Sequence, residues 1–433
     1  MKVSCVLAVG LALIGTGIGA ARALALNVPQ KVHHSRFGEP RLTLSHRGSS
    51  GHRSAGHAAS SATVRGSAAR TSGVRASGRV STASGAHLRR ASLGLRHHYY
   101  ERFTASSFVN GSVGEGDITA GEDPVVRQAA IDALGDMNGT AVVIDPSNGR
   151  ILAMVNQKLA LSPGAEPCST IKLTVALAAL SEGLVTRDTP VQLAGFRMNM
   201  TQALAKSNNL YFEELGRELG FERVRHYANQ FGLGELAGYH IQGEQLGVYP
   251  DHEISAADGG VGRMCSFGQG VSLTPLQLGA YVSAIANGGT LYYLQHPTTA
   301  QEAAQFVPRV KRTLDIARYT PEMADGMAGA VEYGTARRLR ANFQQFPVFG
   351  KTGTCSDNGT RYGWFVSYSQ GPQGDLVTVF FLEGGRPVFG PRAAELTGEF
   401  YKNLWDRDYF ATKNQEAKSD TGLAPGTSVG ATQ

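Results

Sequence analysis

The strand-like segments of this chain fall into two groups that lie far apart in the sequence. Thr140–Asp145 and Arg150–Val155 are apolar runs joined by a Pro-Ser-Asn-Gly turn, which predicts a hairpin. Further strands are predicted near the C-terminal end, at Phe349–Thr354, Tyr362–Tyr368 and Leu376–Leu382. Helical periodicity is found at 124–137, 169–182, 200–219, 276–286, 321–331 and 393–405. This order predicts an α+β domain with a central antiparallel sheet flanked by helices, plus an all-helical subdomain.

Residues 31–100 differ in composition from the rest of the chain. They are rich in Ser, Arg, Gly, Ala and His, and such a segment buries too little apolar surface to offset the entropy of ordering. They carry a net charge of +11, whereas residues 101–433 carry −7. We predict a disordered basic linker over 26–100, which either contacts anionic lipid headgroups or wall polymers or is a solvated spacer. The acidic remainder argues against a nucleic-acid partner.

The N-terminus has the pattern of an export signal. Lys2 precedes an apolar run from Val3 to Ala21, and Ala23-Leu24-Ala25 offers a cleavage site. The run is also long enough for an uncleaved anchor in the inner membrane. Either interpretation of residues 1–25 places the rest of the chain in the periplasm or another extracytoplasmic compartment, where disulfides persist.

The remaining boundaries follow from these assignments. We expect a connecting segment over 101–122, the folded domain over 123–406 and a mobile polar tail over 407–433. Most histidines lie in or beside the basic linker, so the sequence predicts neither a metal site nor a cofactor.

The first candidate site motif is Ser169-Thr170-Ile171-Lys172 at the start of a predicted helix. A serine hydroxyl needs an adjacent base to act as a nucleophile. Residues three apart on a helix lie on one face, so Lys172 can serve as general base for Ser169. The amine fills this role if burial or a nearby positive charge lowers its pKa, and Lys351 can supply that charge. An ordinary helix start is the structural alternative.

The second motif, Ser207-Asn208-Asn209, places polar residues between apolar helical stretches. Ser207 can relay a proton to a leaving amine, and Asn209 can hydrogen-bond the amide of a substrate. A helix cap or a loop explains the same residues without any function.

The third motif is Lys351-Thr352-Gly353-Thr354 on a predicted strand. Lys351, Thr352 and Thr354 can bind a carboxylate, and Gly353 leaves room for a ligand backbone. The backbone N–H groups of Ser169 and Thr354 can form an oxyanion hole. An exposed lysine on a strand is the alternative for this motif taken alone.

In this order the three motifs resemble the S-x-x-K, S-x-N and K-T-G set of penicillin-binding proteins and serine β-lactamases. Flanking segments extend the resemblance to the transpeptidase domain of penicillin-binding proteins over about residues 136–402. They are 141–146, 151–154, Phe267-Gly268-Gln269-Gly270, 273–277, 286–289 and 331–336. The resemblance implies a D,D-transpeptidase or carboxypeptidase that acts on D-Ala-D-Ala peptidoglycan stem peptides. Ser169 would form the acyl-enzyme, and β-lactams would acylate the same serine.

The chain also departs from the family pattern. Cys168 stands where the family usually has glycine, the 38 residues from Ser169 to Ser207 are fewer than usual, and we see no room for a glycosyltransferase or full pedestal domain. Some class A carbapenem-hydrolysing β-lactamases carry a disulfide that flanks the active site in this way. By this similarity we expect a Cys168–Cys355 disulfide, with two buried thiols as the alternative, and a free buried Cys265.

Two other functions compete with this interpretation. A serine β-lactamase needs a deacylation base, and Glu244 is a candidate by position, although its setting resembles a structural segment of penicillin-binding proteins. The other is a non-turnover β-lactam sensor or a wall-binding scaffold; a sensor needs a signalling domain or several membrane spans, and neither is visible in the sequence. The sequence leaves protein partners unknown.

Overall fold

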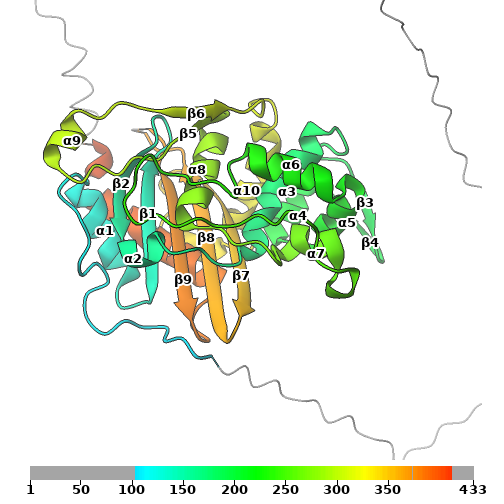
Figure 1. Cartoon of the computed structure of the whole chain (residues 1–433), viewed down its shortest axis with the longest axis horizontal. Helices are drawn as coiled ribbons and strands as arrows, with labels where there is room; N and C mark the ends of the chain where they lie inside the picture. Colours follow the sequence, from blue (N-terminus) through cyan, green and yellow to red (C-terminus); the bar gives the residue numbers. More distant parts are fainter. Residues whose placement is uncertain (1–102, 373, 412–433) are drawn as a thin grey trace, which may run out of the picture. The chain divides into compact units, whose positions relative to one another are not determined.

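The computed structural model describes residues 103–372 and 374–411, which are coloured along the chain in Figure 1. The predicted signal or anchor over 1–25, the linker over 26–100 and most of the predicted tail lie outside the described residues. No helix within the described ranges is both long enough and apolar enough to cross a membrane.

The centre of the domain is a five-stranded antiparallel sheet with the order β2-β1-β9-β8-β7. Its strands are β1 (Gly139–Asp145), β2 (Arg150–Val155), β7 (Val348–Asp357), β8 (Thr360–Ser369) and β9 (Val377–Gly384). β1 pairs with β9, with Val142 opposite Val379, so the N-terminal hairpin completes a sheet begun by the C-terminal strands. This arrangement and the flanking helices confirm the predicted fold class.

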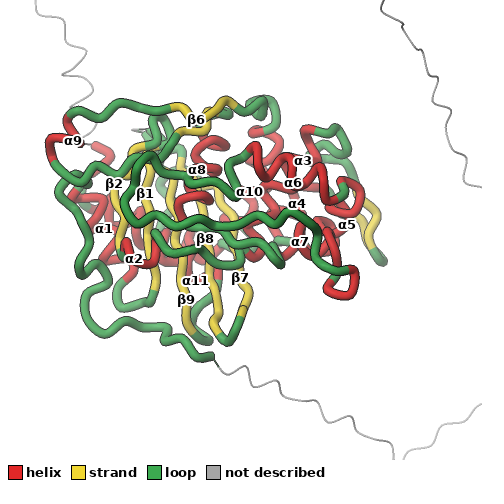
Figure 2. Tube along the Cα trace, viewed as in Figure 1, coloured by secondary structure: helices red, strands yellow, loops and turns green. Residues whose placement is uncertain are grey.

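Helices cover both faces of the sheet (Figures 1 and 2). α1 (Pro124–Leu134) and α11 (Gly390–Asp406) pack together on one face, and α8 (Pro275–Ala286) packs on the other. In β1, Ala141 and Val143 belong to the core with α1 and α11, whereas Val142 and Ile144 belong to the core with α8. Successive side chains of a strand point to opposite faces, so an apolar run such as this one is buried on both sides.

The helical subdomain lies beside β7 and also carries a short hairpin. Its elements are η1 (Cys168–Ile171), α3 (Lys172–Ser181), β3 (Val191–Leu193), β4 (Phe196–Met198), α4 (Met200–Lys206), α5 (Asn209–Leu219), α6 (Phe221–Gln230) and α7 (Gly260–Phe267). The segment 200–219, expected to be mostly helical, is broken at Ser207, which has a φ of +52°. Asn208 then caps α5, because its side chain accepts a hydrogen bond from the Tyr211 N–H at 3.0 Å.

The remaining elements border these two layers. They are α2 (Gln157–Ala160), η2 (Ala256–Asp258), β5 (Thr290–Tyr292), α9 (Ala300–Ala304), β6 (Val310–Thr313), α10 (Thr320–Glu332) and η3 (Arg337–Ala341). α10 packs against α4 and β7, so it joins the helical subdomain to the sheet near the first residues of the third motif.

The expected domain ends differ from the observed ones. Residues 103–122, expected to be a connecting segment, are part of the folded body: the Asp117 carboxylate accepts hydrogen bonds from the Asn156 and Gln157 N–H groups and pairs with Arg127 at 2.7 Å. The tail, expected to begin at 407, is packed as far as 411, because Phe410 is buried in an aromatic cluster with Phe346. Both differences arise from long-range contacts that local composition does not reveal.

Candidate active site

Ser169 lies on η1, and Lys172 is the first residue of α3. The Lys172 Nζ and the Ser169 Oγ form a hydrogen bond of 2.6 Å. Ser169 is partly exposed, whereas Lys172 is completely buried, so the hydroxyl faces the surface and the amine lies behind it. The first motif therefore brings the expected nucleophile and the expected base into direct contact.

The Lys172 amine is held from three sides. Its Nζ donates to the Asn209 Oδ1 at 2.9 Å and to the Ser266 carbonyl oxygen, besides its contact with Ser169. The rings of Phe212 and Phe267 each lie 5.8 Å from it. Burial lowers the pKa of Lys172 to about 7, partly opposed by the negative charge of Glu213. A substantial fraction of this amine is thus neutral at neutral pH and able to accept a proton.

The second and third motifs meet through a separate hydrogen bond. The Lys351 Nζ donates to the Ser207 Oγ at 2.7 Å and to the Thr352 carbonyl oxygen at 2.9 Å. Lys351 is fully buried, and burial together with the positive charge of Lys172 lowers its pKa well below the ordinary value. The site therefore contains two serine–lysine pairs, and the closeness of the lysines disfavours charging both.

The β7 threonines have protein partners. The Thr352 Oγ1 lies 2.6 Å from the Thr335 Oγ1, and the Thr354 Oγ1 accepts a hydrogen bond from the Gly390 N–H at 2.8 Å. The Thr354 hydroxyl keeps its proton as a donor, because the contact with Gly390 uses only its oxygen.

Gly353 lies where two segments of the chain approach closely. A Cβ on this residue would lie 2.8 Å from the Pro167 carbonyl oxygen and 3.2 Å from the Thr170 Cγ2. Its lack of a side chain lets β7 approach the turn that carries Ser169. Gly353 therefore sets the width of the junction between β7 and η1.

A disulfide crosses the same junction. Cys168 and Cys355 are bonded, with 5.5 Å between their Cα atoms and 187 positions between them in the sequence. Cys168 has a φ of +52°, a left-handed conformation that favours glycine. The two bonded cysteines are the sequence neighbours of Ser169 and Thr354, the residues expected to supply the oxyanion N–H groups. Cys265 is a free buried thiol, and burial raises its pKa to about 12.

Several residues near the site were missed by sequence reasoning. Ser266 contributes its carbonyl to Lys172, and Glu213 lies 3.5 Å from the Ser266 Oγ. Neither belongs to a recognisable motif: Glu213 is one of several charged residues on α5, and only the position of Ser266 just before Phe267 gave a signal in the sequence. Glu166 lies three residues before Ser169, and its carbonyl accepts a hydrogen bond from the Trp364 Nε1 at 3.0 Å. Burial raises the pKa of its carboxyl to about 7, with a smaller contribution from Asp357 and an opposing one from Arg263.

The candidate deacylation base of a β-lactamase is used elsewhere. The Glu244 carboxylate accepts hydrogen bonds from the N–H groups of Ala237 and Gly238, at 2.8 and 3.0 Å. This pattern is typical of a carboxylate that stabilises a loop. Among the described residues, no group of three or more His, Cys, Asp and Glu side chains could hold a metal ion.

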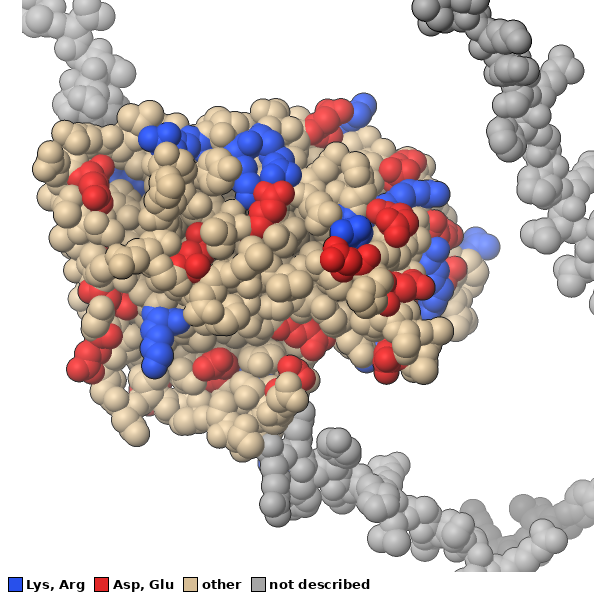
Figure 3. Space-filling view, viewed as in Figure 1, with Lys and Arg blue, Asp and Glu red and all other residues tan. Residues whose placement is uncertain are grey.

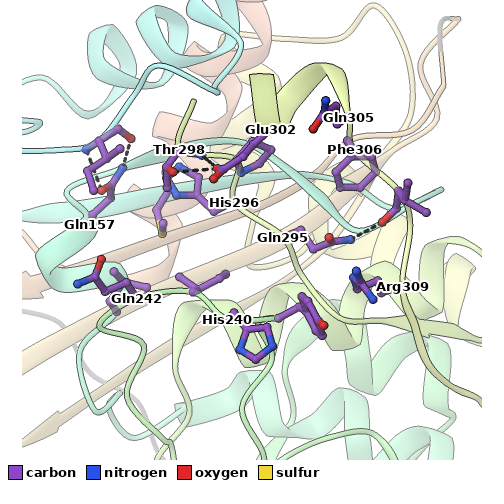
Figure 4. A pocket seen from close by; sticks show the side chains of 17 residues that line it. Gln157, His240, Gln242, Gln295, His296, Thr298, Glu302, Gln305, Phe306 and Arg309 are labelled. Carbon is purple, nitrogen blue, oxygen red and sulfur yellow. Dashed lines mark hydrogen bonds between the residues drawn. The ribbon is translucent and has the colours of Figure 1, made fainter. Parts of the chain in front are cut away.

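A separate cavity of about 510 Å³ is shown in Figure 4. Its lining includes His240, Gln242, Gln295, His296 and Arg309, and none of the motif residues contributes to it. On the face of the domain drawn in Figure 3, acidic and basic side chains are interspersed, which is consistent with the mildly acidic balance of residues 101–433.

The model of the penicillin binding protein transpeptidase domain matches residues 139–402. The chain belongs to this family. The matched range begins at β1 and ends in α11, so it contains the whole sheet and all three motifs.

Curated relatives of this transpeptidase-family chain include two longer proteins. Stage V sporulation protein D of Bacillus subtilis is 30% identical over 257 residues, which cover 49% of this chain and 39% of that protein. Peptidoglycan D,D-transpeptidase MrdA of Acinetobacter baumannii is 25% identical over 384 residues, which cover 69% of this chain and 56% of that protein. The chain thus spans about half of the length of these relatives.

Solved structures share the fold. A structure of Pseudomonas aeruginosa PBP2 in complex with WCK 5153 matches with a TM-score of 0.55 and 23% identity, covering 66% of this chain and 77% of that one. The D,D-transpeptidase domain of a peptidoglycan glycosyltransferase from Eggerthella lenta matches with a TM-score of 0.54 and 20% identity, covering 66% and 82%. Both matches show that the sheet and helices of this chain have the same fold as these two structures.

Proposed function

We propose that this protein is an exported, penicillin-binding serine D,D-transpeptidase or carboxypeptidase that acts on D-Ala-D-Ala peptidoglycan stem peptides. The observation that carries the proposal is the 2.6 Å contact between Ser169 and the fully buried Lys172. A neutral amine in contact with a partly exposed hydroxyl is the arrangement that activates a serine for acyl transfer.

In the proposed acylation, each proton transfer has a side chain of the site as donor or acceptor. Lys172 accepts the proton of Ser169 as the Oγ attacks the carbonyl carbon of the penultimate D-Ala, and the backbone N–H groups of Ser169 and Thr354 stabilise the oxyanion. Collapse of the tetrahedral intermediate breaks the amide bond. Ser207 donates its proton to the leaving D-Ala amine and is reprotonated by Lys172, which returns to its neutral form, while the Ser207 Oγ stays hydrogen-bonded to Lys351. The product is an acyl-Ser169 ester.

Substrate contacts follow from the remaining motif residues. Lys351, Thr352 and Thr354 bind the terminal carboxylate of the stem peptide, and Asn209 hydrogen-bonds its amide. Gly353 keeps the strand close to Ser169. An amine of a second stem peptide then attacks the ester in transpeptidation, whereas water attacks it in carboxypeptidation. β-lactams enter the same path because their strained amide acylates Ser169.

Incubation of the full-length protein with fluorescent penicillin, followed by intact-mass measurement over time, tests the proposal. We expect a stable adduct on the wild-type protein and none on Ser169→Ala. Rapid loss of the adduct would identify a β-lactamase instead, and a wild-type protein without any adduct would contradict the proposal. Turnover of a D-Ala-D-Ala stem peptide then separates an enzyme from a non-turnover sensor or scaffold.

A further inference from the structure

An acidic side chain lies behind the base without taking part in the proposed acyl transfer. We propose that Glu213 is a positioning residue that holds Lys172 in place through Ser266 and stabilises the protonated amine formed during acylation. The inference rests on the proposed function, because it takes Lys172 to be the general base. Glu213 differs from the residues proposed to react with or bind the substrate, because it acts on the reaction through Ser266 and Lys172.

The geometry links Glu213 to Lys172 through one residue. Asn209 and Glu213 are four residues apart on α5, so both face the same neighbours. The Asn209 Oδ1 accepts from the Lys172 Nζ, while the Glu213 carboxylate accepts from the Ser266 Oγ at 3.5 Å. The carbonyl of Ser266 in turn accepts a hydrogen bond from the Lys172 Nζ. Ser266 is fully buried at the junction of α5 and α7. Its side chain contacts Glu213 and its carbonyl contacts Lys172, so this one residue connects the two.

The charges around Lys172 make Glu213 the relevant anion. Lys351 on β7 has a pKa well below its ordinary value because it is buried and faces the charge of Lys172, and Arg263 on α7 lies over the Phe267 ring, 3.9 Å from its centroid. Arg217 pairs with Glu213 at 2.9 Å, but its side chain is 55% exposed, against 16% for Glu213. Solvent screens an exposed charge more strongly than a buried one, so the negative charge of Glu213 affects Lys172 more than the positive charge of Arg217 does.

The direction of the effect follows from these charges. Burial lowers the pKa of Lys172, and Glu213 acts against burial by favouring the protonated amine. Loss of the carboxylate therefore leaves the amine neutral to a lower pH, but makes it a weaker proton acceptor. Such a change moves the pH at which the base becomes active and lowers the maximal rate.

Glu213→Gln in the full-length protein tests this, with Glu214→Gln as the matched control. Glu214 lies on the same helix and pairs with the same arginine at 3.0 Å, but it is 42% exposed. The measurement is the pH dependence of the second-order rate constant for acylation by penicillin. We expect Glu213→Gln to move the acidic limb about half to one pH unit lower and to reduce the plateau several-fold. We expect Glu214→Gln to follow the wild type.

The outcomes separate this inference from the proposed function. A wild-type protein that is not acylated at Ser169 overturns the function itself. An acylated wild type with an unmoved acidic limb in Glu213→Gln, or with equal shifts in both variants, overturns the role of Glu213 alone. If Glu213→Gln fails to fold, Ser266→Ala decides, because it removes the link to Glu213 and keeps the carbonyl. We expect it to lower the plateau, and an unchanged plateau overturns the inference.

Discussion

The Nζ of the completely buried Lys172 is hydrogen-bonded to the Ser169 Oγ at 2.6 Å. Lys351 is equally buried, and its Nζ is hydrogen-bonded to the Ser207 Oγ at 2.7 Å. The first of these contacts joins the proposed nucleophile to its proposed base, and the pH dependence of acylation is the most direct test of the site.

Acylation is expected to depend on pH through Lys172. Burial lowers the pKa of this amine to about 7, and only its neutral form accepts the proton of Ser169. The rate of acylation by penicillin should therefore rise through pH 7, reach a plateau near pH 8 and fall about tenfold per pH unit on the acidic side. Stopped-flow measurements between pH 5 and 9 check this. A rate that is flat between pH 5 and 8 would show that another group limits the reaction.

Lys172 should also make stability depend on pH. Its pKa is about 7 in the folded protein against 10.5 as the ordinary value, so the unfolded chain binds more protons between these pH values. The free energy of unfolding, compared with Lys172→Met, should rise by about 1.4 kcal/mol per pH unit in this window and level off below pH 7. Urea denaturation at pH 6, 7, 8 and 9.5 measures the difference. Lys206→Met, at an exposed position of α4, should show no such slope.

The disulfide should stabilise the domain. In the chain-entropy model, a crosslink between residues 187 positions apart contributes about 5 kcal/mol, and the measured value is often smaller. Cys168→Ser/Cys355→Ser should therefore lower the midpoint of thermal unfolding by several degrees and slow acylation, because the crosslink joins the residues next to the two proposed oxyanion donors. Reductant should reproduce both effects in the wild type and have none in the double variant. Equal stability of the oxidised and reduced wild type would contradict this role.

Gly353→Ala should damage the site by forcing two segments apart. The added Cβ would lie 2.8 Å from the Pro167 carbonyl oxygen, and backbone cannot yield as a side chain can. We expect a loss of about 1–3 kcal/mol in the free energy of unfolding and a larger relative loss in acylation rate. Gly385→Ala is the control, because its Cβ would approach only the Phe103 side chain, at 3.3 Å. Similar losses in both variants would indicate a general effect on the sheet.

Local patterns in the sequence predicted the parts of the fold correctly. The hairpin at 139–155 follows from two apolar runs and a turn, and the helix at 275–286 follows from a Thr-Pro start that forms a capping box. These signals depend on residues within a few positions of one another. They allow a helix cap or a loop at Ser207-Asn208-Asn209, but the apolar period continues on both sides, so only the packed structure fixes the break at Ser207.

The sequence by itself determined which chemical groups this protein has, because the three motifs, their order and the two cysteines beside them are local features. The tertiary structure alone decided their long-range partners: Lys172 with Asn209 and Ser266, Lys351 with Ser207, and Gly353 against Pro167. It also decided the pKa of Lys172, together with the presence of Ser266 and Glu213 behind it. The physical reason is that burial and long-range contacts set the energy of a charge, and both exist only once distant segments have packed together.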